Sequence, residues 1–254
     1  MTSDKDARRK EILKELGLTP VWRARTTNQP ESTTQASAGR STAGEPDCSA
    51  PVDAAADRRL KILRMGWDEL ETSVAGCIAC PLCHSRTRTV FGVGDRSADW
   101  LYVGEGPGAQ EDATGEPFVG QAGKLLDNML AAIDLKRGRN VFIANIVKCR
   151  PPGNREPTPY EAHQCEPYLA RQIELIKPKL IMALGKVAVQ NLLETDASIG
   201  SLRGRLHQHS GIPVIVTYHP AYLLRTLTAK AKAWEDLCFA RSTMQRLAPL
   251  QSMD

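Results

Sequence analysis

Four short apolar runs, separated by segments of helical periodicity, constrain the possible folds of this chain more than any other feature. The apolar runs are residues 100–104, 141–147, 179–185 and 213–218. Apolar residues recur at helical spacing in residues 121–134, 158–177, 186–193 and 229–247. Short strands that alternate with amphipathic helices are typical of an α/β fold with a mostly parallel sheet. We therefore predict an α/β three-layer sandwich around a central, mostly parallel four-stranded sheet.

The residues before these runs differ in composition. Residues 1–25 include the amphipathic stretch DARRKEILKELGL, which predicts a short helix. Residues 26–56 are rich in Ser, Thr, Ala, Gly and Pro, a composition typical of a disordered linker. A further helix is predicted over residues 57–74. We therefore place a single globular domain at residues 57–254, behind a flexible N-terminal extension.

The charge of the chain gives only a weak indication of a nucleic-acid partner. The net charge is +4, and beyond residue 64 the chain carries 21 Lys and Arg residues against 20 Asp and Glu residues. A nucleic-acid site must therefore rest on local clusters of cations, such as Lys148, Arg150 and Arg155, Arg203 and Arg205, or Arg225. No apolar run approaches the length of a membrane span, and the charged N-terminus lacks the apolar segment of a signal peptide. These features predict a cytoplasmic protein without a membrane partner.

Five of the seven cysteines form a candidate metal site. Cys77 and Cys80 are a C-x2-C pair, which can bind one face of a metal centre. Cys149 and Cys165 lie far downstream and could complete a site of four thiolates. Cys83 extends the first pair to C-x2-C-x2-C, so spacing alone leaves it as another candidate ligand. Spacing also leaves zinc and an iron–sulfur cluster open as alternatives.

The loop GEGPGA at residues 104–109 fits the G-x-G-x-x-G/A pattern of dinucleotide-binding proteins. In those proteins the loop leads directly into a helix whose N–H groups bind a pyrophosphate. Here Glu105, Glu111 and Asp112 place negative charge in the loop, and we expect the next helix only near Gln121. Both features argue against dinucleotide binding.

Three polar segments follow predicted strands and should meet at the carboxyl edge of the sheet, where α/β proteins bind ligands. They are the GEGPG loop, residues 145–150 and residues 219–225. Asn145 ends an apolar strand, and its amide could match the edge of a base, although a purely structural role is an alternative. His219 would lie above the same crevice, where it could act in catalysis rather than in structure alone.

Several longer motifs follow one another between residues 77 and 241. They are CIAC, RTRTVFGVGD, GEGPGAQED, TGEPFVGQAG, NIVKCRPPGNREP and HPAYLLR. With them, the chain closely resembles the family 4 uracil-DNA glycosylases, the iron–sulfur branch of the uracil-DNA glycosylase superfamily. The resemblance implies a uracil-DNA glycosylase-like domain with a [4Fe–4S] cluster. Its ligands would be Cys77, Cys80, Cys149 and Cys165, without Cys83.

The resemblance further implies a monofunctional DNA glycosylase of base excision repair. Such an enzyme flips uracil out of single- or double-stranded DNA and hydrolyses its N-glycosidic bond, leaving an abasic site. Phe118 would stack on the flipped uracil, and Asn145 would read its edge at N3 and O4. His219 would stabilise the negative charge that develops on the O2 side as the bond breaks.

The sequence does not determine which group positions the hydrolytic water. Better-known uracil glycosylases carry a water-activating Asp where this chain has Gly106. The water would be positioned by Glu105, Glu111 or a main-chain carbonyl, or it would attack a nearly formed oxocarbenium ion. The backbone of Gly106 and Gly108 would approach the uracil.

The segment after His219 would bind the DNA. Leu223 or Leu224 would fill the vacated base stack, while Arg225 and Arg155 would hold phosphates. Two other functions are alternatives: a non-enzymatic, cysteine-stapled nucleic-acid-binding domain, and a relative that captures uracil-DNA covalently through a histidine in an insertion. No such insertion is evident between residues 120 and 141. We expect a monomer whose N-terminal extension could recruit a repair partner.

Overall fold

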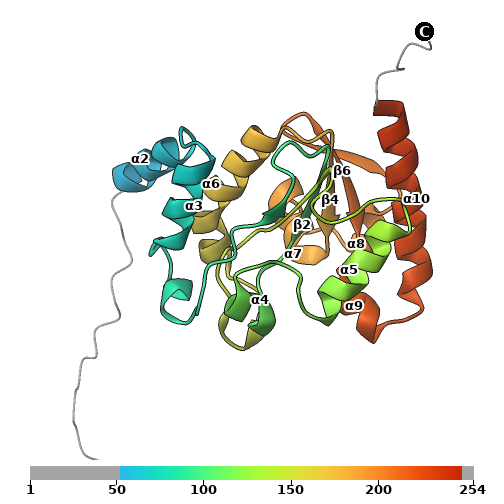
Figure 1. Ribbon diagram of the computed structural model, residues 1–254, viewed down its shortest axis with the longest axis horizontal. Helices are drawn as coiled ribbons and strands as arrows, with labels where there is room; N and C mark the ends of the chain where they lie inside the picture. The colour runs from blue at the N-terminus through green and yellow to red at the C-terminus, as the bar shows by residue number, and fades with distance from the viewer. Residues whose placement is uncertain (1–51, 248–254) are drawn as a thin grey trace, which may run out of the picture. The chain divides into compact units, whose positions relative to one another are not determined.

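The structure, a computed structural model, describes residues 52–247, which form an α/β domain around one sheet (Figure 1). The strands are β1 (Val93–Gly94), β2 (Trp100–Gly104), β3 (Val141–Asn145), β4 (Leu180–Leu184), β5 (Leu206–His209) and β6 (Ile212–Thr217). Their order in the sheet is β1-β3-β2-β4-β6-β5. The central β3, β2, β4 and β6 are parallel, whereas β1 and β5 pair antiparallel at the two edges. The predicted α/β fold with a mostly parallel sheet is confirmed.

The sheet has six strands rather than the predicted four. The two additional strands are at its edges, and the sequence gives little sign of them. Strand β1 is only two residues long. Strand β5 reads LHQH and is partly exposed along its whole length. Short or polar edge strands lack the apolar run that marks a buried strand.

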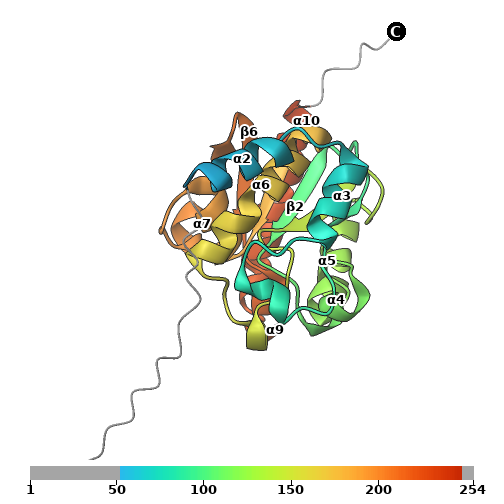
Figure 2. The same ribbon diagram turned by 90° about the vertical axis from the view of Figure 1, so that its left-hand side faces the viewer.

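Alternate side chains of the central strands face two different helical layers. Leu101 and Val103 pack into one core, whereas Trp100 and Tyr102 pack into the other. The first layer contains α2 (Val52–Ile62), α3 (Trp67–Ala75), α6 (Pro159–Ile176) and α7 (Lys186–Leu193). The second contains α5 (Gln121–Ala131), α9 (Pro220–Arg225) and α10 (Ala229–Leu247). Figure 1 shows α2, α3 and α6 on one side of the strands and α5 and α10 on the other, while Figure 2 shows α2 and α6 running together in the first layer.

The segment before the sheet differs from its prediction. The helix expected over residues 57–74 is divided into α2 and α3, and Gly66 precedes the first residue of α3. Because α2 begins at Val52, it overlaps the end of the predicted linker, residues 26–56. The rest of that linker and the helix predicted within residues 1–25 lie outside the described residues. The remaining short elements are η1 (Pro81–His84), α4 (Ala109–Thr114), η2 (Pro152–Asn154) and α8 (Ile199–Leu202).

Helix α6 begins and ends as its sequence predicts. The Thr158 hydroxyl accepts a hydrogen bond from the N–H of Glu161, and the Glu161 carboxylate accepts one from the N–H of Thr158. Pro159 occupies the first helical position, where its missing N–H costs nothing. The helix ends at Ile176, just before Pro178.

The loops after the parallel strands meet at one edge of the sheet, as the sequence predicts. Gly104 and Asn145 end β2 and β3 and are paired in register. Strand β6 ends at Thr217, two residues before His219. Gly185, directly after β4, lies so close to His219 that a Cβ atom there would be 2.8 Å from the His219 Cβ atom. Within residues 52–247, no helix is long and apolar enough to cross a membrane.

Candidate active site

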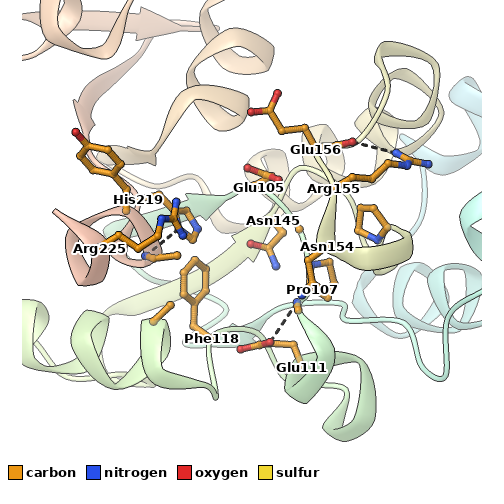
Figure 3. A pocket seen from close by; sticks show the side chains of 16 residues that line it. Glu105, Pro107, Glu111, Phe118, Asn145, Asn154, Arg155, Glu156, His219 and Arg225 are labelled. Atoms are coloured by element: carbon orange, nitrogen blue, oxygen red, sulfur yellow. Dashed lines mark hydrogen bonds between the residues drawn. The ribbon is translucent and has the colours of Figure 1, made fainter. Parts of the chain in front are cut away.

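A cavity of about 450 Å³, which we call the base cavity, lies at this carboxyl edge of the sheet (Figure 3). The predicted site residues that line it are Glu105, Gly106, Gly108, Glu111, Phe118, Asn145, Arg155, His219 and Arg225. They come from segments that are far apart in the sequence. In the view of Figure 3, Asn145 lies centrally, with Phe118 and His219 to one side. The structure thus brings together most of the residues that the sequence indicates.

Asn145 presents an amide to this cavity without a protein partner for its oxygen. The residue is only 2% exposed, and Oδ1 has no hydrogen-bond partner within residues 52–247. A buried amide oxygen without a partner costs about 1–3 kcal/mol, so such groups usually mark a site that a ligand or water completes. Gly104 makes room for this amide, because a Cβ atom at residue 104 would lie 2.5 Å from Oδ1.

Lys148, one of the cations that the sequence offers for a nucleic-acid site, is instead buried and supports the backbone of Asn145. Lys148 is 1% exposed, and its Nζ donates to the carbonyl of Asn145 (3.0 Å) and to Oε1 of Gln172 (2.7 Å). Gln172 in turn donates to the carbonyl of Phe91 (2.9 Å). Burial lowers the pKa of Lys148 to about 8. Its position in the mostly apolar segment NIVKC was a signal of burial in the sequence. A buried ammonium group must have hydrogen-bond acceptors, so a structural role could have been expected.

Phe118 is held in a strained backbone conformation beside His219. Its φ is 56°, a left-handed conformation that is uncommon for a bulky residue. Arg137 donates from Nη2 to the Phe118 carbonyl (2.8 Å), and Gly123 lets that carbonyl approach α5, since a Cβ atom at residue 123 would clash with it. The phenyl ring lies 5.5 Å from the imidazole ring of His219, at an angle of 31°. The ring therefore forms an apolar wall of the cavity.

His219 is held as a neutral imidazole with a defined tautomer. It precedes the first residue of α9, and its Nδ1 accepts a hydrogen bond from the N–H of Ala221 (3.2 Å). Burial, and secondarily the charge of Arg225, lower the pKa of His219 to about 4. At neutral pH the proton of the ring is therefore on Nε2, because Nδ1 acts as an acceptor. The site thus offers an N–H donor from an uncharged ring.

The two glutamates of the GEGPG loop have different environments. Both Glu111 carboxylate oxygens accept backbone hydrogen bonds, Oε2 from Gly108 (3.1 Å) and Oε1 from Val119 and Gly120 (3.0 Å each). Burial raises the pKa of Glu105, and the neighbouring Glu156 raises it further. Glu111 therefore braces the loop, whereas Glu105 faces the cavity as a carboxyl group of raised basicity.

The helix expected only near Gln121 in fact begins directly after this loop, which corrects one part of the argument against dinucleotide binding. Helix α4 begins at Ala109, immediately after Gly108. Its N-terminus is nevertheless not available to a pyrophosphate, because the Glu111 carboxylate accepts from Gly108 at the first turn. Gly106 is also constrained, since a Cβ atom there would lie 2.7 Å from Cγ2 of Val147. An aspartate at residue 106 would therefore not fit without a shift of Val147.

The predicted DNA-binding residues fall into different environments. Leu223 is 1% exposed and packs into the core beneath α9, whereas Leu224 is 42% exposed. Only Leu224 is therefore available as a wedge. Arg225 lines the cavity, and Arg155 lines it while donating to both carboxylate oxygens of Glu161 (2.8 and 2.7 Å).

The candidate ligand cysteines line a second, smaller cavity, which we call the cysteine cavity. Cys77, Cys80, Cys149 and Cys165 all face it, and so does Cys83. Burial raises the pKa of the Cys80 thiol to about 11 and that of the Cys165 thiol to about 12. Within residues 52–247, no three His, Cys, Asp or Glu side chains are close enough together to hold a single metal ion.

Hydrogen-bond donors surround these sulfur atoms. Arg86 Nη1 donates to Sγ of Cys149 (3.1 Å), and the backbone N–H of Lys148 donates to Sγ of Cys165 (3.2 Å). Arg58 Nη2 lies 3.7 Å from Sγ of Cys77. Cations and N–H donors stabilise thiolates, so this donor set fits a negatively charged metal–thiolate group.

The chain is similar in sequence to several known proteins. A sequence model of the uracil DNA glycosylase superfamily matches residues 91–238. The chain is 44% identical over 165 residues to the type-4 uracil-DNA glycosylase of Archaeoglobus fulgidus, which covers 62% of this chain and 82% of that protein. It is 43% identical over 177 residues to the type-4 enzyme of Thermotoga maritima, with coverages of 68% and 92%. The type-5 uracil-DNA glycosylase of Pyrobaculum aerophilum is more distant, at 28% identity over 191 residues, with coverages of 62% and 84%.

Proposed function

This chain belongs to the uracil DNA glycosylase superfamily and is a uracil-DNA glycosylase, and we propose that Asn145 and His219 carry out uracil excision in the base cavity. One observation carries this assignment: the buried, unpartnered Oδ1 atom of Asn145 faces the same cavity as a neutral imidazole. A ligand that completes the amide must offer an N–H donor. The imide edge of uracil offers one at N3.

Asn145 reads the uracil edge. Its Oδ1 accepts from the N3–H of uracil, and its Nδ2 donates to O4. Cytosine presents an acceptor at N3 and donors at N4, so each contact would then be mismatched inside a buried site. Mismatched polar contacts in a site built for hydrogen bonding give strong discrimination. Phe118 supplies the ring against which the flipped base stacks, worth about 1–3 kcal/mol.

His219 stabilises the leaving group. As the bond between C1′ and N1 breaks, its electron pair passes to the uracil ring and negative charge develops at O2. The Nε2–H of His219 donates to that oxygen, and the ring needs no proton from solvent because it acts while neutral. Water adds its oxygen to C1′ and gives up one proton, and the uracil anion takes up one proton at N1, which leaves an abasic site and free uracil.

Glu105 is the group that we assign to the water. It faces the cavity with a carboxyl of raised pKa, so it can orient the water and take its proton. Both oxygens of Glu111 already bind backbone N–H groups, so we assign Glu111 a positioning role in the loop that carries Gly106 and Gly108. This division keeps one carboxylate for chemistry and one for structure.

The DNA is held around the mouth of the cavity. Leu224 enters the vacated stack, while buried Leu223 anchors α9 to the core. Arg225 binds a phosphate, and Arg155, fixed by Glu161, binds another. These four residues explain how flipping, which costs a few kcal/mol, is offset by new contacts.

The cysteine cavity fits an iron–sulfur cluster. We propose Cys77, Cys80, Cys149 and Cys165 as the ligands of a [4Fe–4S] cluster, because they line one cavity and receive N–H donors. Such a cluster would join the segment after α3, the loop after β3 and helix α6, which are remote in sequence. Its role in this proposal is structural.

An excision assay tests the proposal. Purified full-length protein is incubated with oligonucleotides that contain uracil in single strands, U:G pairs or U:A pairs, followed by alkaline cleavage of abasic sites. We expect excision of uracil, no excision of cytosine, and iron in the purified protein. Binding without excision by protein of full iron content would instead favour a non-enzymatic nucleic-acid-binding domain. A heat-stable protein–DNA adduct would favour covalent capture.

A further inference from the structure

Helix α9 carries an exposed aromatic side chain at the mouth of the base cavity that the mechanism above does not use. Tyr222 lines the cavity and is 38% exposed, and it is separated from exposed Leu224 by the buried Leu223. Its backbone N–H donates to the carbonyl of His219 (2.9 Å), so its position is tied to that of the catalytic imidazole.

The ring of Tyr222 is the outer member of a stack of planar groups. It stacks on Tyr218, with ring centroids 5.1 Å apart and an angle of 23° between the planes. The guanidinium carbon of Arg203 lies 5.2 Å from the centroid of the Tyr218 ring. Arg203 is fixed in turn by Nε, which donates to Oδ2 of the buried Asp236 (2.7 Å), and by a hydrogen bond to the carbonyl of Lys232. A buried ion pair therefore fixes the orientation of a ring at the surface.

We propose that Tyr222 is a stacking platform for an unpaired nucleobase, the one next to the extruded uracil in the same strand. Aromatic rings that are fixed beside a strand path are the usual sites for stacking of single-stranded bases. The exposed Leu224 and the cation of Arg225 on the same short helix already mark this path. The inference rests on the proposed function, because it places the neighbouring base relative to a uracil bound at Asn145.

The platform favours single-stranded substrates over duplexes. In a duplex, the neighbouring base keeps its own stack and its pairing partner, so contact with Tyr222 replaces interactions of similar strength. In a single strand, the neighbouring base is free to stack, and the contact is a net gain. Loss of Tyr222 should therefore weaken single-strand binding more than duplex binding.

Binding to an oligonucleotide with a tetrahydrofuran abasic analogue in place of the uracil tests the inference, because no excision can occur. We expect Tyr222→Ala to weaken single-strand binding about 5- to 150-fold, and duplex binding much less. Tyr222→Phe should bind within about twofold of wild type, since the ring rather than the hydroxyl makes the contact. Tyr222→Leu keeps apolar area without a π face and should resemble Tyr222→Ala.

Salt dependence separates stacking from charge. Tyr222→Ala should leave the slope of log K against log salt unchanged, whereas Arg225→Ala should reduce it by about 0.7 for one lost phosphate contact. Trp234→Ala removes another exposed aromatic, outside the cavity, and should bind like wild type. Wild-type affinity in Tyr222→Ala, equal losses in Tyr222→Phe and Tyr222→Ala, or equal losses on single strands and duplexes would overturn the platform. Uracil excision by the wild-type protein, assayed in parallel, tests the proposed function separately.

Discussion

The base cavity and the cysteine cavity differ in how their polar groups are satisfied. In the base cavity, the amide oxygen of Asn145 has no partner in the part of the chain that the structure describes, and Glu105 lines the cavity. In the cysteine cavity, the sulfurs of Cys149 and Cys165 already receive N–H donors from the chain. The first arrangement suits a ligand that binds transiently, while the second suits the permanently bound cluster that we propose. Changes in the base cavity should therefore affect excision, and changes in the cysteine cavity should affect folding.

The largest effect is expected from Cys165→Ser, which removes a buried cysteine of α6 that we propose as a cluster ligand. We expect loss of most bound iron and of several kcal/mol of stability, because metal–thiolate bonds contribute directly to folding. In a domain of this size, each kcal/mol lost lowers the melting temperature by about 2–4 °C. Iron content, visible absorbance and thermal unfolding measure the outcome. Cys238→Ser, at an exposed cysteine of α10, is the matched control and should change none of them. Full iron content in Cys165→Ser would contradict the ligand assignment.

The next largest effect is expected from Asn145→Ala, and it should have the opposite signature. Removing a group that recognises uracil should lower kcat/KM by about 10²–10³-fold, as for other preorganised hydrogen-bond groups in active sites. Iron content should stay constant, and stability should stay equal or rise slightly, because an unpartnered buried oxygen is removed. Single-turnover excision and thermal unfolding, measured on the same preparation, test both expectations. Wild-type excision would show that the amide does not read the base.

Lys148→Met tests whether the two cavities are independent. Lys148 donates to the Asn145 carbonyl through its side chain and to Cys165 through its backbone. The substitution leaves two buried acceptors without their donor, each at a cost of about 1–3 kcal/mol. We expect a lower melting temperature together with weaker excision. Because the backbone N–H that donates to Cys165 remains in this variant, iron content should stay at the wild-type value, and loss of iron would show that the Lys148 side chain also supports the cysteine cavity. Wild-type excision would show that the side chain does not position Asn145.

Much of the fold could be predicted from the sequence, because burial leaves a simple pattern. Apolar runs predict the parallel strands to within about two residues, and the capping sequence at Thr158 gives the start of α6. The two edge strands could not be found, because β1 has only two residues and β5 is mostly polar and partly exposed. The division of the predicted 57–74 helix had a local signal in Gly66, because glycine disfavours the interior of a helix and is accepted at its N-cap.

The candidate site was predictable in its members but not in their roles. Position after a strand was enough to bring Asn145 and His219 to one edge. Position cannot show that Glu111 is saturated by backbone donors while Glu105 is not, because that depends on where the chain returns at Val119. It also could not decide between Leu223 and Leu224, since neighbouring residues on a short helix differ in burial only once the helix is docked.

A smaller effect is expected on the pH dependence of stability, because burial lowers the pKa of His219. Its pKa is about 4 in the folded protein and about 6.5 when unfolded, so between these values the unfolded chain binds more protons. Stability should therefore rise with pH through this window, by up to about 3 kcal/mol from this residue. The rise should be smaller in His219→Asn, as measured by chemical unfolding at several pH values. Equal pH profiles would show that His219 is not held neutral by the fold.

The smallest effect is expected from Cys83→Ser, which tests whether Cys80 or Cys83 is the second ligand in this part of the cysteine cavity. Cys83 lines the same cavity as the proposed ligands, and its backbone N–H donates to the carbonyl of Cys80 (3.2 Å), so proximity alone does not separate the two cysteines. We expect iron content, absorbance and melting temperature to stay close to wild-type values, because serine is similar in size and Cys83 is only partly buried and outside the proposed ligand set. Cys80→Ser, three residues away on the same turn, should instead lose the cluster. If Cys83→Ser loses iron and Cys80→Ser keeps it, the ligand set is Cys77, Cys83, Cys149 and Cys165. In that case the spacing of the first pair is five residues, and η1 forms part of the cluster-binding loop.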